Sequence, residues 1–143
     1  EKIPNSFFVI VGDGNERLEI EKLIDKMELT DSVLITGWVK NTYEYIQTFD
    51  VAMLLSRWEG FGLAAVEGMA AGKPVIASNV SGLAEEVRGG GLLFSKGNSE
   101  ELADAIKFLL EDETKYQQVK EACIKRSNCY SIEKMVKNYI KLY

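Results

Sequence analysis

The chain has 143 residues, of which 46% are hydrophobic and 27% are charged, an ordinary composition for one globular domain with a sizeable core. Its net charge of −5, without a dense basic run, argues against nucleic acid and anionic membranes as main partners. The absence of histidine excludes a Ser-His-Asp hydrolase and a His-ligated metal site within these residues.

Short apolar runs and helical patterns alternate along the chain. The runs are continuous and rich in β-branched and aromatic residues, which is typical of strands buried on both faces. The segments between them carry apolar residues at helical spacing. In chain order the sequence predicts a strand over residues 6–11, a helix over 15–29, a strand over 33–36, a helix over 42–47, a strand over 50–55, a helix over 63–71, a strand over 74–78, a helix over 82–88 and a strand over 92–94.

The last third of the chain is predicted to be helical. Asn98 followed by Glu101 resembles a capping box that opens an amphipathic helix. A second helix is predicted over residues 114–127, and a last one over 131–143. One face of the last helix carries Ile132, Met135, Val136, Tyr139, Ile140 and Tyr143, a stripe typical of core or interdomain packing.

The two cysteines, Cys123 and Cys129, are too far apart for a zinc site and lack further ligands nearby. We therefore interpret them as free thiols. Unpaired thiols and the absence of a secretory signal favour a cytoplasmic protein.

Strands that alternate with helices predict a parallel sheet flanked by helices, which is a Rossmann-like α/β fold. Ligands of such sheets bind beyond the carboxyl ends of the strands. Three turns are expected at that edge, namely Gly12-Asp13-Gly14, Gly37-Trp38-Val39 and Glu59 to Leu63. Asp13 is interpreted as a turn residue.

The turn from Glu59 to Leu63 carries the most chemical information. Gly60 and Gly62 leave room for a ligand near the backbone, and the helix that follows offers unpaired N–H groups to a phosphate. Glu59 and Glu67 are acceptors that suit sugar and ribose hydroxyls, so the pattern favours a nucleotide sugar. From these residues alone, the alternative stays open that both carboxylates are ordinary loop and helix charges.

Residues 56–88 resemble the donor-binding motif of the retaining glycosyltransferases of family four, the glycosyl transferases group 1. Their pattern of a glutamate, seven residues and a second glutamate is met by Glu59 and Glu67. The segments Glu59-Gly60-Phe61-Gly62-Leu63 and Gly68 to Ala77 also match closely, and the likeness covers nearly the whole chain.

The resemblance implies the C-terminal, donor-binding half of a two-domain GT-B enzyme of cell-surface polysaccharide or glycolipid synthesis. It implies that Glu59 acts on the donor sugar as the catalytic residue and that Glu67 binds the ribose diol. No metal or other cofactor is expected besides the nucleotide-diphosphate-sugar donor. The remaining donor-binding positions implied are Gly12, Gly14, Trp38, Val39, Gly60, Phe61, Gly62 and Leu63.

Two parts of such an enzyme are expected outside residues 1–143, which we interpret as a single domain. One is the N-terminal acceptor domain, which could also attach the protein to a membrane. The other is a first strand and helix that supply an Arg and a Lys to the diphosphate. That strand is normally central in such a sheet, so the remaining strands could close the gap, another chain could fill it, or one half of the sheet could pack differently. Arg57 is a weaker candidate for that charge, and Lys73 lies at the wrong end of its helix. We expect no activity from this chain alone.

Several alternatives stay open at this point. The chain could be a noncatalytic nucleotide-sugar binding or assembly module, or a sugar-nucleotide epimerase of the same fold. The rings of Trp58 and Phe61 are interpreted as packing rather than as sugar-stacking groups. The last helix could pack against the other domain, or it could form a homo-oligomer, as could an exposed sheet edge.

Overall fold

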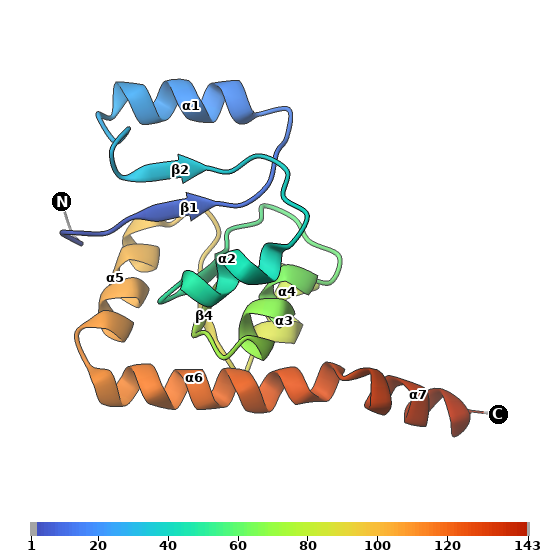
Figure 1. Ribbon diagram of the computed structural model, residues 1–143. Helices are drawn as coiled ribbons and strands as arrows, with labels where there is room; N and C mark the ends of the chain where they lie inside the picture. The colour runs from blue at the N-terminus through green and yellow to red at the C-terminus, as the bar shows by residue number, and fades with distance from the viewer. Residues whose placement is uncertain (1–2, 143) are drawn as a thin grey trace. The chain divides into compact units, whose positions relative to one another are not determined.

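The computed structural model describes residues 3–142, and the chain divides into two compact units, Glu1–Tyr45 and Ile46–Tyr143 (Figure 1). Both units are built from parallel strands connected by helices. This architecture confirms the predicted α/β class.

Unit 1 contains two parallel strands and the helix that connects them. Strand β1 (Phe8–Ile10) leads into α1 (Arg17–Lys26), and the chain returns in β2 (Val33–Ile35), with Val9 opposite Leu34. An antiparallel bridge between Gly12 and Gly37 joins the turns that follow the two strands. Helix α2 (Thr42–Thr48) then carries the chain from unit 1 into unit 2.

Unit 2 contains a three-stranded parallel sheet in the order β3-β4-β5 and most of the helices. Its strands are β3 (Ala52–Leu54), β4 (Val75–Ser78) and β5 (Leu92–Phe94). Its helices after α2 are α3 (Leu63–Ala70), α4 (Leu83–Val87), α5 (Ser99–Leu110), α6 (Glu113–Ser127), the short 3₁₀ turn η1 (Asn128–Tyr130) and α7 (Ile132–Ile140).

The core of unit 2 forms around its central strand. All four residues of β4 are buried, because neighbouring strands cover its edges and helices cover its faces. Three helices pack on this strand through fully buried side chains, which are Met69 of α3, Leu83 of α4 and Cys123 of α6. Each large apolar side chain removed from water in this way contributes about 2 kcal/mol to stability.

The predicted elements are all present, but most strands are shorter than predicted. The sequence left open whether the strands would close into one sheet without the expected first strand. Among the described residues they do not, because hydrogen-bonded pairing stops between β2 and β3. The predicted capping box is half formed. Asn98 accepts from the backbone N–H of Glu101, whereas the Glu101 carboxylate accepts from the backbone N–H of Ser95 at 2.8 Å.

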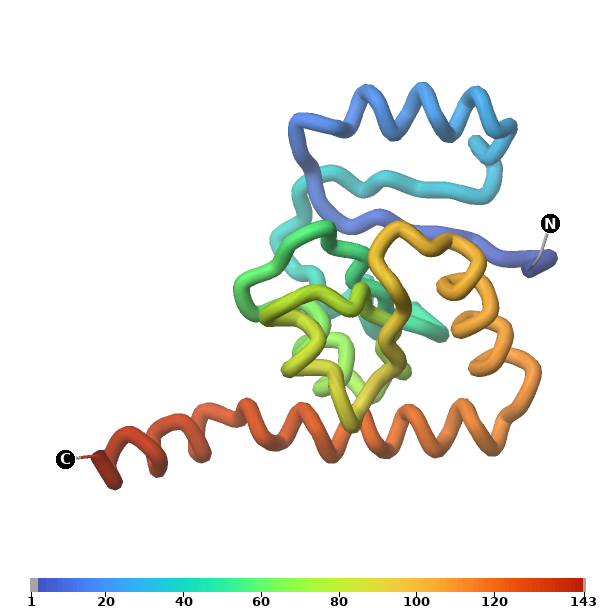
Figure 2. Tube along the Cα trace, turned by 180° about the vertical axis from the view of Figure 1, so that it is seen from behind, coloured from blue at the N-terminus to red at the C-terminus, as the bar shows by residue number. Residues whose placement is uncertain are grey.

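Helix α7 extends past the end of α6, away from the strands of unit 2 (Figure 2). Its stripe from Ile132 to Ile140 is exposed, which excludes core packing of Tyr139 within this chain and leaves interdomain packing as the remaining interpretation. Tyr143 lies outside the described residues. Within residues 3–142, no helix has the length and apolar content needed to cross a membrane.

Candidate functional site

The segment from residue 56 to 62, called here the Glu59 turn, connects the carboxyl end of β3 to the start of α3. The carboxylate of Glu59 is half-buried and is held over its own turn. One oxygen accepts a hydrogen bond from the backbone N–H of Gly60 at 3.1 Å, and the other accepts from the hydroxyl of Ser56 at 3.3 Å. Because each carboxylate oxygen can accept two hydrogen bonds, Glu59 keeps acceptor capacity for a ligand.

The two glycines of the Glu59 turn have different reasons to be glycine. Gly62 lies in the left-handed region with φ 83°, and a Cβ there would lie 2.5 Å from Leu83 Cδ1. The fold itself therefore favours glycine at this position, whether or not a ligand also approaches the backbone there, as the sequence suggested. A Cβ at Gly60 would meet no atom within 4 Å, which leaves that position open on the outside of the turn.

Gly82 supports the same turn, although the sequence pattern gave it no individual role. It follows the end of β4, has φ 84°, and would place a Cβ 2.5 Å from the carbonyl oxygens of Glu59 and Gly60. The segment between β4 and α4 therefore lies directly against the backbone of the Glu59 turn. A glycine between a buried strand and a short helix was the sequence signal that could have revealed this contact.

Glu67 lies on the exposed side of α3, between the buried residues Val66 and Gly68. Its carboxylate is thus available to solvent, near the start of the helix that follows the Glu59 turn. The side chain of Trp58 is 83% exposed, so the interpretation of this ring as packing is wrong. Leu63, the first residue of α3, is also exposed.

Phe61 packs against the C-terminal part of unit 2, as the sequence suggested. Its ring meets that of Tyr130 edge to face, with centroids 5.7 Å apart and planes at 90°. The guanidinium of Arg126 lies over the other ring of this pair, 5.1 Å from the centroid of Tyr130. Burial, together with the carboxylate of Glu86, raises the pKa of Tyr130 to about 12, so its hydroxyl is protonated at neutral pH.

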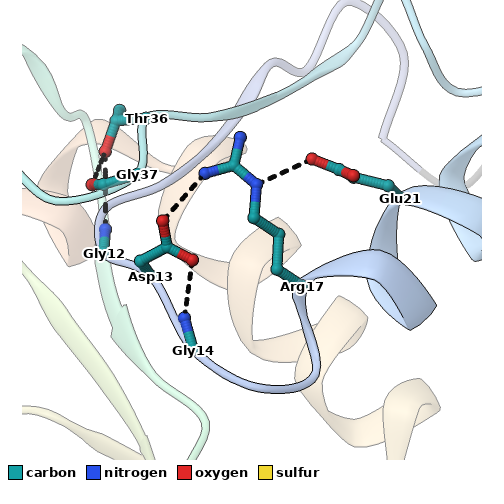
Figure 3. A network of polar contacts seen from close by, with 7 residues as sticks. All are labelled: Gly12, Asp13, Gly14, Arg17, Glu21, Thr36 and Gly37. Atoms are coloured by element: carbon teal, nitrogen blue, oxygen red, sulfur yellow. Dashed lines mark hydrogen bonds and ion pairs between the residues drawn. The ribbon is translucent and has the colours of Figure 1, made fainter.

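In unit 1 a polar network connects the two turns that follow β1 and β2 (Figure 3). Asp13 accepts from the backbone N–H of Gly14 at 2.8 Å and pairs with Arg17 at 3.1 Å, and Arg17 also donates to Glu21 at 2.8 Å. These carboxylates raise the pKa of the Arg17 guanidinium. Asp13 is a turn residue, as predicted.

The second half of this network holds the backbone of the two turns together. The backbone N–H of Gly12 donates to the carbonyl of Gly37 at 3.1 Å, and the hydroxyl of Thr36 donates to the same carbonyl at 2.8 Å. A Cβ at Gly37 would lie 3.0 Å from Nη1 of Arg17. Arg17 therefore covers the second turn while it is paired to the first.

A hollow of about 410 Å³ lies beside these residues in unit 1. Gly12 and Gly14, two of the predicted donor-binding residues, line it. Trp38 and Val39 are not among its lining residues, and the ring of Trp38 is 79% exposed. The lining is formed by Ile10, Val11, Gly12, Asp13, Gly14, Asn15, Glu16, Arg17, Ile20 and Ile35.

The cations near the Glu59 turn follow the expectation only in part. Lys73 donates to the carbonyl of Gln47 at 2.8 Å, at the C-terminal end of α3, as predicted from its position in the sequence. Arg57 is an exposed residue of the turn itself, one position after Ser56. In the described part of the chain, no three His, Cys, Asp or Glu residues gather closely enough to bind a metal ion.

The sequence matches the family of glycosyl transferases group 1 over residues 1–126. The chain belongs to this family. It is 35% identical over 114 residues to the lipopolysaccharide core biosynthesis glycosyltransferase LpsD of Rhizobium meliloti, covering 78% of this chain and 33% of LpsD. It is 34% identical over 140 residues to the N-acetyl-alpha-D-glucosaminyl L-malate synthase of Bacillus anthracis, covering 94% of this chain and 36% of the synthase.

Solved structures of this kind have the same fold. Anabaena Alr3699/HepE in complex with UDP superposes with a TM-score of 0.86 at 25% identity, over 99% of this chain and 42% of that one. The same protein in complex with UDP-glucose gives a TM-score of 0.82 at 28% identity, over 87% of this chain and 36% of that one. The chain thus spans between a third and somewhat over two-fifths of the length of the relatives compared here.

Proposed function

We propose that this chain is the donor-binding part of a glycosyltransferase that uses a nucleotide-diphosphate sugar. The observation that carries the proposal is the Glu59 turn of a member of the family, in which the carboxylate of Glu59 keeps acceptor capacity beside the exposed Gly60 and an exposed Glu67 follows on α3. Such acceptors suit the two hydroxyl-rich ends of a nucleotide sugar, whose diphosphate would pass between them. The UDP complexes of Alr3699/HepE support this choice of ligand class.

Residues of the Glu59 turn and of the start of α3 would each contact a different part of the donor. Glu59, kept in place by Ser56 and Gly60, orients the donor sugar and stabilises positive charge that develops at its anomeric carbon. Glu67 accepts from the ribose diol. The backbone N–H groups of Phe61, Gly62 and Leu63 lie against sugar and phosphate. Transfer retains the anomeric configuration, and neither a metal nor a further cofactor is needed.

The predicted base site belongs to unit 1. Trp38 and Val39 would contact the base, and Gly12 and Gly14 would let the ligand come close to the backbone. The hollow lined by Gly12 and Gly14 supports this assignment. The positive charge of Arg17 is already paired with the carboxylates of Asp13 and Glu21 there, so this turn suits a neutral base better than a phosphate.

The parts that complete the enzyme would lie in a longer polypeptide. The acceptor domain, and the first strand and helix with their diphosphate-binding Arg and Lys, are proposed to come from outside residues 1–143, which are inactive alone. The exposed stripe of α7 would pack on that other domain, or on a second copy of the chain. We place the enzyme in the cytoplasm, with membrane attachment through the other domain and with a role in polysaccharide or glycolipid synthesis.

The test is calorimetry of the longest natural polypeptide that contains this chain, with UDP, UDP-glucose, GDP-mannose and ADP-glucose as probes. Glu67→Gln should weaken binding of the preferred nucleotide about tenfold or more, because a charge-assisted hydrogen bond to the ribose is lost. Glu59→Gln should weaken binding of the nucleotide sugar but should not change the affinity for the free nucleotide, which lacks the sugar that Glu59 contacts. Glu121→Gln, which changes an exposed glutamate of α6, serves as the matched control.

Two results would contradict the proposal. One is that none of the four probes binds the wild-type protein. The other is that Glu59→Gln and Glu67→Gln both bind like the control. Tight binding without sugar transfer to any acceptor by the complete polypeptide would instead favour a noncatalytic binding module, and reversible change of the donor sugar alone would favour an epimerase.

A further inference from the structure

The Glu59 turn is rich in glycine, and besides its backbone contacts it is anchored by one aromatic side chain. Gly60 and Gly62 flank Phe61, and glycine gives a backbone more conformations to lose on ordering than any other residue. Trp58 and Leu63, the other large apolar residues of this segment, are exposed by 83% and 62%, whereas Phe61 is exposed by 44%. The difference arises because the edge of one aromatic ring meets the face of the other in the pair Phe61–Tyr130.

Tyr130 is itself fixed from two sides. It packs against the buried core of unit 2, and the guanidinium of Arg126 lies over its ring at 5.1 Å. Arg126 cannot move freely, since its Nε donates to the carbonyl of Glu86 at 2.9 Å and its Nη2 donates to the carbonyl of Glu85 at 2.6 Å. These two carbonyls belong to the last residues of α4, so Arg126 also caps the C-terminal end of that helix.

The opposite end of α4 contacts the Glu59 turn directly. Leu83, its first residue, would collide with a Cβ at Gly62, and Gly82 lies against the carbonyls of Glu59 and Gly60. Arg126 is therefore connected to the Glu59 turn by two chains of contacts, although it does not touch the turn itself. In the first, Arg126 binds the end of α4, whose start contacts the backbone of the turn. In the second, Arg126 lies over the ring of Tyr130, which contacts the ring of Phe61.

We propose that Tyr130 is a positioning residue for donor binding, which fixes the backbone of Phe61 through ring-to-ring contact while Arg126 holds Tyr130 in place. This inference rests on the proposed function. A turn ordered before the ligand arrives loses less conformational entropy on binding, so fixing Phe61 raises affinity without any contact between Tyr130 and the donor. An edge-to-face aromatic pair supplies about three- to tenfold in such an equilibrium.

The experiment is a double-mutant cycle on the dissociation constants of UDP and UDP-glucose, measured by calorimetry with the complete polypeptide. Tyr130→Leu and Phe61→Leu are each expected to weaken binding of UDP-glucose by about three- to tenfold. The double variant should bind no worse than the weaker single variant, because both changes remove the same contact. Tyr130→Phe keeps the ring and should bind like the wild type.

Tyr116→Leu is the matched control for a loss of stability alone. Tyr116 is a partly buried tyrosine of α6 whose hydroxyl donates to the carbonyl of Asp50 at 2.9 Å, at the start of β3 rather than at the Glu59 turn. Each variant is measured at least ten degrees below its own unfolding midpoint, so that affinity is compared among folded proteins. Tyr116→Leu should lower the midpoint but leave affinity unchanged.

The outcomes separate this inference from the proposed function. Additive effects of the two leucine variants, or wild-type affinity in Tyr130→Leu, would overturn the positioning role while nucleotide-sugar binding stands. A loss of affinity in Tyr130→Phe equal to that in Tyr130→Leu would also overturn it, since the hydroxyl and not the ring would then be responsible. If Tyr130→Leu does not fold, Phe61→Leu decides, because it removes the same ring contact, and wild-type affinity for UDP-glucose in that variant would overturn the positioning role. Failure of UDP and UDP-glucose to bind the wild type overturns both proposals together.

Discussion

The Gly12 turn of unit 1, residues 12–14, and the Glu59 turn of unit 2 both follow a parallel strand and both precede a helix. They are stabilised by different interactions. In the Gly12 turn, charged side chains hold the backbone, with Arg17 between Asp13 and Glu21 at the surface. In the Glu59 turn, close steric contacts at Gly62 and Gly82 and an aromatic pair hold it. Salt should therefore affect the first turn, and side-chain size should affect the second.

The largest expected effect is that of a methyl group at Gly82. Gly82→Ala should destabilise the protein by about 3 kcal/mol or more, because φ 84° is unfavourable for alanine and its Cβ would press on two backbone carbonyls. Gly60→Ala is the matched control, with open space around its Cβ, and should change stability by less than about 0.5 kcal/mol. Urea denaturation measures both. Equal stability of the two variants would mean that close packing does not hold the Glu59 turn.

A second expected effect is a loss of stability that appears only at alkaline pH and is caused by the buried thiol of Cys123. Burial raises the pKa of the Cys123 thiol from 9.0 to about 11, so the folded state holds this proton more tightly than the unfolded state. The stabilisation is complete below pH 9 and is lost as pH rises through about 11, a change on the order of 3 kcal/mol.

Cys123→Ala should remove this part of the pH dependence, measured as the free energy of unfolding in urea between pH 8 and pH 11 relative to wild type. Cys129→Ala, which changes the exposed thiol, should leave the dependence as it is in the wild type. A wild-type slope in Cys123→Ala would show that other groups cause the alkaline loss. The thiol of Cys123 would then not contribute to the pH dependence of the free energy of unfolding.

The smallest effect is expected from Arg17→Gln, because exposed ion pairs contribute little. Thermal unfolding should show a slight loss of stability at low ionic strength that disappears at about 1 M salt, where charges are screened within a few ångströms. Hydrogen exchange at the amide of Gly14, which Asp13 accepts from, should speed up in the same variant. Lys22→Gln removes a charge from the same helix and should not change exchange at Gly14. A loss that persists at high salt would contradict the electrostatic origin.

The sequence predicted the kind and order of the elements well, because their apolar spacing is strong and local. It also placed Glu59, Gly60 and Gly62 in one turn before a helix. The pattern Asp13, Arg17, Glu21 has the four-residue spacing of paired charges, so the network of unit 1 could have been found from sequence and was overlooked.

Other features could not be predicted from local pattern. The contact between Phe61 and Tyr130 joins distant segments, and helical periodicity does not say which side chain faces which turn. Whether the strands form one sheet or two stayed open in the sequence, since alternation of strands and helices gives their direction but not which edges pair. The packing reason for Gly62 could not be found from sequence, because a missing side chain looks the same whether a ligand or Leu83 needs the space.

The two exposed tryptophans offer an optical consequence of this arrangement. The chain contains two tryptophans, and one lies beside each of the compared regions, Trp38 after Gly37 and Trp58 before Glu59. A solvated indole fluoresces at long wavelength and is quenched freely by small molecules in solution. Under the proposed function, Trp58→Phe would leave Trp38 to report on the base and Trp38→Phe would leave Trp58 to report on the sugar, so two single-tryptophan variants would follow the two ends of the ligand separately through emission wavelength and quenching.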